Sequence, residues 1–261
     1  MTNSSADPHT AATARLAAAA VSGVPCPPIR DLVAADDVAG AYAIQALLIA
    51  ERIAAGRRRV GRKIGLTAEA VRRQLGVDQP DSGVLLDDMR VSGTVPAGRL
   101  LQPRAEAEVA FVLAADIVSA VDGPDAARPF VGAACAAIEI VDSRIAGWDI
   151  TIADTIADNA SSGLFVLGAQ RTPLTAFEPA EVGMTLSRNG QMASQGSGAD
   201  CMGDPLAALA WLANRCIELG DPLRAGEVVL SGALGPVVPV GSGDTVEAHI
   251  SALGSVQVSF A

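Results

Sequence analysis

The pattern of apolar and polar positions divides the chain into a helical first part and a largely extended second part. Apolar residues recur at helical spacing between an N-cap at Asp36 or Asp37 and a stop at Gly56. An alanine-rich stretch at residues 16–21 has the character of a second helix. We therefore expect residues 1–60 to be mainly helical.

The rest of the chain, residues 61–261, shows mostly the alternation that is typical of strands. Asn189-Gly190 lies between two extended arms, as in a β-hairpin, and residues 245–260 alternate around Leu253-Gly254. The pattern predicts an α+β fold. In it, the helical N-terminal portion precedes a β-rich domain built on a curled, mixed β-sheet.

Two further helices interrupt the β-rich part. The first is expected to run from an N-cap at Thr67 to Leu75 and to stop at Gly76. The second begins at Asp204-Pro205 and stops at Gly220. Both predictions rest on a capping side chain at the start and a glycine at the end.

Composition and charge exclude several classes of function. Half of the 261 residues are apolar and the formal net charge is −10, so the chain can bury a sizeable core but repels nucleic acid. The one basic run, Arg57–Arg59, is interpreted as a solvated helix end. Residues 16–21 are too weakly apolar for a signal peptide or a membrane span. The four cysteines lack metal-site and disulfide spacing, which indicates reduced thiols in the cytoplasm.

Two carboxylates begin an otherwise apolar strand at residues 104–113. Because side chains i and i+2 of a strand share one face, about 6.6 Å apart, Glu106 and Glu108 point the same way. Burying two carboxylates side by side is costly unless a cation compensates. Either Arg104 neutralises one of them at a wet end of the strand, or both belong to a metal site.

Glu139 favours the metal site. It lies within residues 136–141, which are otherwise small or strand-forming apolar residues. Arg144 could neutralise it in an ion pair, which is the structural alternative. Three glutamates entering apolar strands could instead form an all-oxygen site, and such ligands favour Mg²⁺ or Mn²⁺ over zinc. Three carboxylates leave about three positions of an octahedral shell for water and substrate, as in a catalytic site.

Lys63 is the single lysine among nineteen lysine and arginine residues. An ammonium group can lose its proton near neutral pH in a suitable environment, whereas a guanidinium group effectively cannot. Chance placement is the alternative, since one lysine must fall somewhere. Its position in a glycine-flanked segment, away from the charged runs, favours a role in proton transfer or in binding a substrate carboxylate.

Six segments, in order, carry a resemblance to a known family. They are KIGLT at 63–67, QLGVDQPDSGVL at 74–85, PRAEAEVAFVL at 103–113, IEIVDSRI at 138–145, DTIADNASSG at 154–163 and LSGALGP at 230–236. They look like the 2-hydroxypenta-2,4-dienoate (2-keto-4-pentenoate) hydratase family of the fumarylacetoacetate hydrolase superfamily. The resemblance covers the chain from about residue 35 onward.

The resemblance implies a curled mixed sheet, a divalent metal held by three glutamates, and homo-oligomers of five or ten subunits. The family's metal ligands fall on Glu106, Glu108 and Glu139, so residues 61–261 are expected to be a metal-binding catalytic domain. It also places Lys63 and Asp81 beside the metal as candidates for acid–base work. Ser161 could hold a substrate oxygen or the attacking water. From the residues alone, Asp81 and Ser161 would equally suit ordinary turns.

The implied activity is a Mg²⁺-dependent addition of water to a small anionic 2-hydroxy-2,4-dienoate, or its 2-oxo-4-enoate tautomer. The product is a 4-hydroxy-2-oxo acid, in the meta-cleavage catabolism of aromatic compounds. The alternative is decarboxylation of a 2-oxo-3-enedioate such as 4-oxalocrotonate, which needs a second cationic contact. A C–C bond hydrolase and a non-enzymatic metal-binding protein rank lower. Ser82 stands where relatives commonly carry an aromatic residue, so the substrate pocket is expected to be wider if Ser82 faces the substrate tail.

Overall fold

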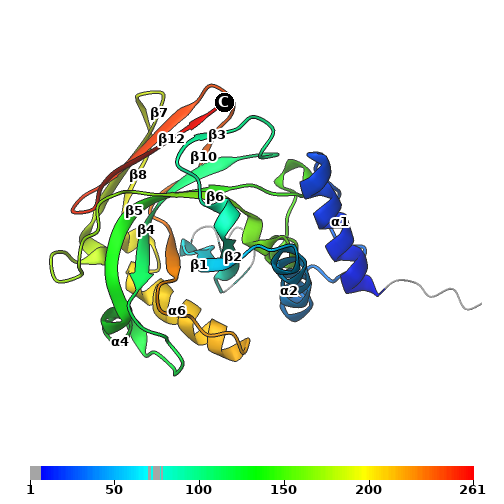
Figure 1. Cartoon of the computed structure of the whole chain (residues 1–261), viewed down its shortest axis with the longest axis horizontal. Helices are drawn as coiled ribbons and strands as arrows, with labels where there is room; N and C mark the ends of the chain where they lie inside the picture. Colours follow the sequence, from blue (N-terminus) through cyan, green and yellow to red (C-terminus); the bar gives the residue numbers. More distant parts are fainter. Residues whose placement is uncertain (1–6, 70–71, 73–76, 78) are drawn as a thin grey trace, which may run out of the picture.

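The computed structural model describes residues 7–69, 72, 77 and 79–261 (Figure 1). Most of the helix that we expected between Thr67 and Leu75 lies outside these residues. The described helices are α1 (Pro8–Ser22), α2 (Val38–Ala54), α4 (Gly123–Ala127), α5 (Ile152–Ala157) and α6 (Pro205–Glu218). None of them is long and apolar enough to cross a membrane.

Side-chain caps explain where the long helices begin. Asp7, Asp37 and Asp204 each accept a hydrogen bond from a backbone N–H of the first turn of α1, α2 and α6. The helices predicted after Asp37 and Asp204 are therefore confirmed. The first of them ends at Ala54, slightly before the expected stop at Gly56.

The described strands form two sheets. Their bounds are β1 (Arg59–Gly65), β2 (Asp81–Leu86), β3 (Gly93–Val95), β4 (Arg104–Leu113), β5 (Val131–Val141), β6 (Ser162–Leu167), β7 (Gly183–Arg188), β8 (Gln191–Ser197), β9 (Val228–Ala233), β10 (Val238–Pro239), β11 (Thr245–Ile250) and β12 (Gly254–Phe260). The larger sheet has the order β2-β1-β9-β4-β5-β6, with β10 paired to β4, and the smaller has the order β3-β12-β11-β7-β8.

The larger sheet is mixed and strongly curved. Strands β1 and β9 are parallel, whereas β4 is antiparallel to both β5 and β9. In Figure 1 the long strands β4 and β5 bend over their whole length, so the sheet partly closes on itself. The α+β architecture with a curled mixed sheet is thus confirmed. Both predicted hairpins are also present, because β7 pairs with β8 and β11 pairs with β12.

The pleat of β4 separates the main core from the opposite face of the strand, which carries the glutamates. Val109 and Phe111 point into the largest apolar cluster, which the smaller sheet and α6 complete. Residues of the opposite face, such as Ala110, belong to a second cluster that includes Ile49 of α2. Because side chains alternate along a strand, Glu106 and Glu108 lie on this second face.

The N-terminal helices pack against a later part of the chain. Leu16 of α1, Ile44 of α2 and Ile156 of α5 are fully or almost fully buried in one cluster. The helical character of residues 1–60 is confirmed for the part that the structure describes, whereas the domain boundary at residue 60 stays a prediction. Arg59 corrects one interpretation: it belongs to β1 and forms ion pairs with Asp221 and Glu227, so it is not part of a solvated helix end.

Candidate active site

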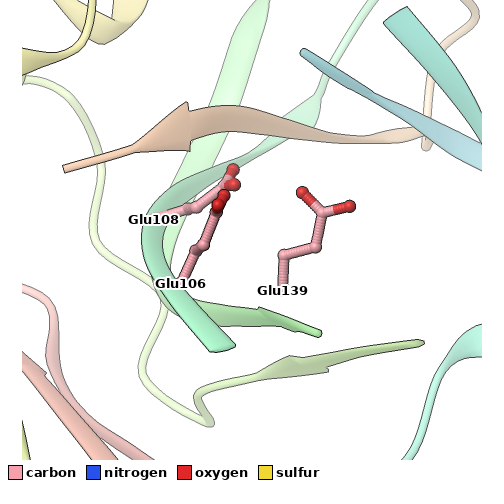
Figure 2. A group of neighbouring side chains, drawn as sticks. All are labelled: Glu106, Glu108 and Glu139. Atoms are coloured by element: carbon pink, nitrogen blue, oxygen red, sulfur yellow. The ribbon is translucent and has the colours of Figure 1, made fainter. Parts of the chain in front are cut away.

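Three glutamates from two neighbouring strands form an acidic cluster. The antiparallel register of β4 and β5 places Glu106 directly opposite Glu139, and Glu108 follows two residues later on the same face. Each residue offers a carboxylate oxygen within 4.8 Å of those of the other two (Figure 2). The structure thus brings together all three residues that the sequence singled out as metal ligands.

The cluster contains carboxylate oxygens without hydrogen-bond partners. Within the described residues, this holds for the buried Oε1 of Glu108 and for both carboxylate oxygens of Glu139. The other oxygen of Glu108 accepts a hydrogen bond from the backbone N–H of Gly232 at 2.7 Å, which orients this carboxylate. Buried carboxylates without partners are costly, so the cluster fits a hard divalent cation with oxygen ligands.

Burial and mutual repulsion raise the pKa of each glutamate. Burial and the neighbouring Glu139 carboxylate raise the pKa of Glu106 to about 7. The pKa of Glu108 is raised well above its usual range by the same two causes, with a further contribution from Glu106. Burial also raises the pKa of Glu139, although Lys63 opposes the rise. A cation in the cluster would favour the charged carboxylates and displace their protons.

Lys63 lies against this cluster. It projects from β1, its side chain is only 4% exposed, and its Nζ is 3.5 Å from Oε1 of Glu139. Burial disfavours the ammonium form, but the carboxylates of Glu139, Asp81 and the two other glutamates outweigh it and raise the pKa of Lys63 to about 12. Without a cation in the cluster, Lys63 is therefore fully charged.

Asp81 begins β2, opposite Gly65 of β1. A Cβ at Gly65 would lie 2.2 Å from Oδ1 of Asp81 and 3.2 Å from Nζ of Lys63, so glycine leaves space for both of these groups. The Oδ2 of Asp81 accepts a hydrogen bond from Thr155 at 3.2 Å. Burial raises the pKa of Asp81, and the ammonium group of Lys63 partly offsets this rise.

Ser161 ends a strained turn that follows α5. Asn159, Ala160 and Ser161 all have left-handed backbone angles, with φ of 54°, 51° and 51°. The turn is held because the Asn159 side chain bonds both the N–H and the C=O of Val84 in β2, at 2.7 and 2.9 Å. Gly83 permits this approach, since a Cβ there would lie 2.5 Å from the carbonyl oxygen of Asn159. Such strain recurs at functional sites.

Thr155 is a residue of this site that sequence reasoning did not select. Its hydroxyl donates to Asp81 and lies 3.2 Å from the hydroxyl of Ser161. The residue stood within a segment that carried the family resemblance, but threonine in a short helix has no distinctive local signal. Its role is visible only once β2 and α5 are placed together.

The two arginines considered as alternatives to a cation contact other groups, although the charge of Arg104 still opposes the rise in the pKa of Glu106. Arg144 forms an ion pair with Asp158 and donates to the backbone carbonyl of Ser162 at 2.7 Å, so its expected alternative pairing with Glu139 is wrong. The Arg104 guanidinium lies over the Trp148 ring, 4.2 Å from its centroid. Neither arrangement removes the need for a cation at the cluster.

Ser82 is turned toward α2. Its hydroxyl lies 3.2 Å from the Tyr42 hydroxyl, and its backbone N–H donates to the same phenol oxygen at 3.1 Å. Since neighbouring residues of a strand point to opposite faces, Ser82 does not share the face of Asp81. The structure therefore gives no basis for a pocket widened at this position.

The chain is similar to known proteins over most of its length. Residues 71–261 match the family model described as fumarylacetoacetate (FAA) hydrolase C-terminal. The chain is 49% identical over 241 residues to the 2-keto-4-pentenoate hydratase of Paraburkholderia xenovorans (strain LB400), covering 92% of this chain and 90% of that protein. It is 43% identical over 231 residues to the 2-hydroxyhexa-2,4-dienoate hydratase of Comamonas testosteroni, covering 85% and 86%.

A solved structure shares almost the whole fold. The 4-oxalocrotonate decarboxylase from Pseudomonas putida G7, complexed with magnesium and adipate, superposes with a TM-score of 0.94 at 28% identity, and 98% of each chain is covered. The sequence identity to the hydratases is considerably higher than this value. The chain therefore belongs to the fumarylacetoacetate hydrolase family and, within it, to the 2-keto-4-pentenoate hydratases.

Proposed function

We propose that this enzyme is a metal-dependent hydro-lyase that adds water to a small anionic 2-hydroxy-2,4-dienoate, or its 2-oxo-4-enoate tautomer, in the meta-cleavage catabolism of aromatic compounds. The product is a 4-hydroxy-2-oxo acid. The observation that carries the proposal is the three-glutamate cluster with Lys63 packed against it. The chain that contains this cluster shares 49% sequence identity with a hydratase. Each part of the site then has a distinct task.

Glu106, Glu108 and Glu139 would hold the divalent cation, Mg²⁺ or Mn²⁺. The support is the donor set, which consists of carboxylate oxygens alone, and the lack of a hydrogen-bond partner, within the described structure, for the buried Oε1 of Glu108 and both carboxylate oxygens of Glu139. When bound, the cation would supply Lewis-acid polarisation of a 2-oxo or 2-hydroxy acid. The backbone N–H of Gly232 keeps the Glu108 carboxylate in place.

Two carbon atoms of the substrate, C5 and C3, must each gain a proton in this reaction. The enol hydroxyl must lose its proton and C5 must gain one, which gives the unsaturated 2-oxo acid. Water must then lose a proton as its oxygen adds at C4, and C3 must gain a proton. We assign proton transfer to Lys63 and Asp81, because both are buried and Gly65 leaves space for them to approach each other.

Ser161 is assigned to a substrate oxygen or to the attacking water. Its hydroxyl is linked through Thr155 to Asp81, so it belongs to the same polar network as the proton-transfer candidates. The left-handed turn leaves its position little freedom, because Asn159 fixes the turn on β2. Because this hydroxyl already has a fixed position, it can orient a reactant without being ordered when the reactant binds.

Decarboxylation of a 2-oxo-3-enedioate is the second candidate. It is favoured by the near-complete structural match to the 4-oxalocrotonate decarboxylase. The hydratase assignment has the stronger support, since identity is 49% to a hydratase and 28% to that decarboxylase. A decarboxylase substrate also carries a distal carboxylate that needs its own cation.

We further propose that the enzyme is a cytoplasmic homo-oligomer, a pentamer or decamer. All four cysteines are buried and free, which suits a reducing compartment. Val21, in the last turn of α1, and Val24, just after this helix, are 90% and 65% exposed, which is compatible with subunit contacts there. Analytical ultracentrifugation measures the oligomeric state directly.

The decisive experiment is an assay of the purified enzyme with 2-hydroxypenta-2,4-dienoate and, separately, 4-oxalocrotonate. Loss of the dienoate ultraviolet absorbance should require Mg²⁺ or Mn²⁺ and should stop with EDTA. NMR should identify 4-hydroxy-2-oxopentanoate as the product. Release of CO₂ from 4-oxalocrotonate, without hydration of the dienoate, would instead establish the decarboxylase.

A further inference from the structure

We propose that Thr155 is a positioning residue for the hydration reaction. Its hydroxyl joins Asp81 and Ser161 in a directed hydrogen-bond chain, and this inference rests on the proposed function. The Thr155 Oγ1 lies 3.2 Å from Oδ2 of Asp81 and 3.2 Å from Oγ of Ser161. The exposed fractions of Asp81, Thr155 and Ser161 are 1%, 4% and 3%, so water competes little for these bonds.

The hydroxyl of Thr155 forms hydrogen bonds with residues outside its own helix. A threonine within a helix commonly bonds the carbonyl oxygen three or four residues earlier. Thr155 instead donates to a carboxylate of β2, and its other partner belongs to the turn after α5. This threonine therefore connects α5 and the turn that follows it to the distant strand β2.

The chain has a fixed direction when Asp81 is a carboxylate. A carboxylate only accepts hydrogen bonds, and a hydroxyl has one proton to donate. Because Thr155 donates its proton to Asp81, Ser161 must donate its own proton to Thr155. The hydroxyl proton of Ser161 then points toward Thr155, and the oxygen lone pairs of Ser161 can accept a hydrogen bond from substrate or water.

The surrounding structure holds the spacing of this chain. The Nε2 of Gln45 donates to the carbonyl oxygens of Ser82 and Ile156, at 2.9 and 2.8 Å. These carbonyls belong to the residues that directly follow Asp81 and Thr155. One buried side chain of α2 therefore sets the distance between β2 and α5.

Two substitutions distinguish the effect of the Thr155 hydroxyl group from the effect of the side-chain shape. Thr155→Val keeps the branched volume and removes the hydroxyl, whereas Thr155→Ser keeps the hydroxyl. At saturating Mg²⁺, Thr155→Val should lower kcat about 10²-fold and leave KM and calorimetric Mg²⁺ affinity within about threefold. Thr155→Ser should retain kcat within about threefold. Thr172→Val is the matched control, because it removes another buried hydroxyl with two hydrogen bonds, one donated to the Ala252 carbonyl and one accepted from the Gln170 side chain.

A double variant tests whether Thr155 acts through Ser161. Thr155→Val combined with Ser161→Ala should lose little more kcat than Ser161→Ala alone, because both changes break one chain. Multiplied losses would show independent roles. Equal damage from Thr155→Ser and Thr155→Val would assign the effect to packing. Either result overturns the proposal, as does a Thr155→Val enzyme with wild-type kcat.

A crystal structure of Thr155→Val gives a readout that does not depend on turnover. We expect the Ser161 hydroxyl to leave its rotamer or to find a new partner. Unchanged positions of Ser161 and Asp81 would overturn the positioning role. Failure of the wild-type enzyme to hydrate any dienoate would instead refute the proposed function, so the two failures are distinguishable.

Discussion

The Nζ of Lys63 lies 3.5 Å from Oε1 of Glu139, although two strands, β9 and β4, separate their strands in the sheet. In a flat sheet, three strand spacings would hold the two backbones about 14 Å apart. The side chains meet because the sheet curls across this face (Figure 1). Curvature is therefore what brings the single lysine of the chain to the acidic cluster.

The first prediction concerns the carboxylates of the cluster. Glu106→Gln and Glu139→Gln should each reduce Mg²⁺ affinity by at least about tenfold and abolish most hydratase activity, because an amide oxygen is a weaker, uncharged ligand. Glu247→Gln, on the exposed side of β11, is the matched control and should behave as wild type. Isothermal titration calorimetry and the dienoate assay measure both effects. Full activity with full Mg²⁺ affinity in either variant would place the metal elsewhere.

The second prediction concerns Lys63. A bound cation offsets the carboxylates that hold its pKa at about 12, and the lysine pKa should then fall. Lys63→Arg should lower kcat by about 10²- to 10⁴-fold, because an arginine has no neutral form near pH 7. The measurement is the pH dependence of kcat for both enzymes at saturating Mg²⁺. Near-wild-type turnover by Lys63→Arg would show that the residue is only an electrostatic anchor.

The third prediction concerns pH and removal of the metal. In the metal-free protein the pKa of Glu106 rises from 4.5 to about 7, so its protonated form stabilises the fold below pH 4.5 and this stability is lost as the pH rises through about 7. Mg²⁺ should therefore raise the melting temperature most above pH 7, by on the order of 5 °C relative to EDTA.

Differential scanning calorimetry at several pH values, with Mg²⁺ and with EDTA, checks this dependence. The Glu139→Gln protein is a suitable comparison, since it should show a smaller effect of Mg²⁺ at every pH. An effect of Mg²⁺ that is equally large at pH 4.5 and pH 8 would contradict the role of carboxylate titration.

The fourth prediction concerns the space at Gly65. Gly65→Ala would place a Cβ 2.2 Å from Oδ1 of Asp81 and 3.2 Å from Nζ of Lys63, so the Asp81 carboxylate would have to shift. We expect at least a tenfold loss of kcat with Mg²⁺ affinity largely retained. Gly183→Ala, at the start of β7, meets no atom within 4 Å and should leave kcat unchanged. Equal activity of the two variants would exclude a tight packing requirement at Gly65.

Much of the site followed from short-range patterns. The two-residue period of a strand placed Glu106 and Glu108 on one face, and β4 has this geometry. Glu139 was suspected because a charge within an apolar strand needs a partner. Its position opposite Glu106 depends on how β5 returns along β4, which the local pattern does not specify.

Other features arise only from contacts between distant segments. Thr155 hydrogen-bonds to Asp81, and Asn159 hydrogen-bonds to Val84. In both pairs the partner is more than seventy residues away in the chain. The sequence motif suggests Ser82 as a pocket residue, but its hydroxyl contacts Tyr42 of α2, forty residues earlier in the chain. Such pairings require the packing of α2 and α5 on β2, which no single motif encodes.

The family match leaves out a strand that lies inside the larger sheet. The family match begins at residue 71, whereas β1 ends at Gly65 and lies between β2 and β9. A polypeptide trimmed to residues 71–261 would lack Lys63 and would leave β2 and β9 with unpaired edges, which promote aggregation. Boundaries taken from this family match would therefore remove an inner strand of the larger sheet, and expression of this enzyme should retain the N-terminal segment.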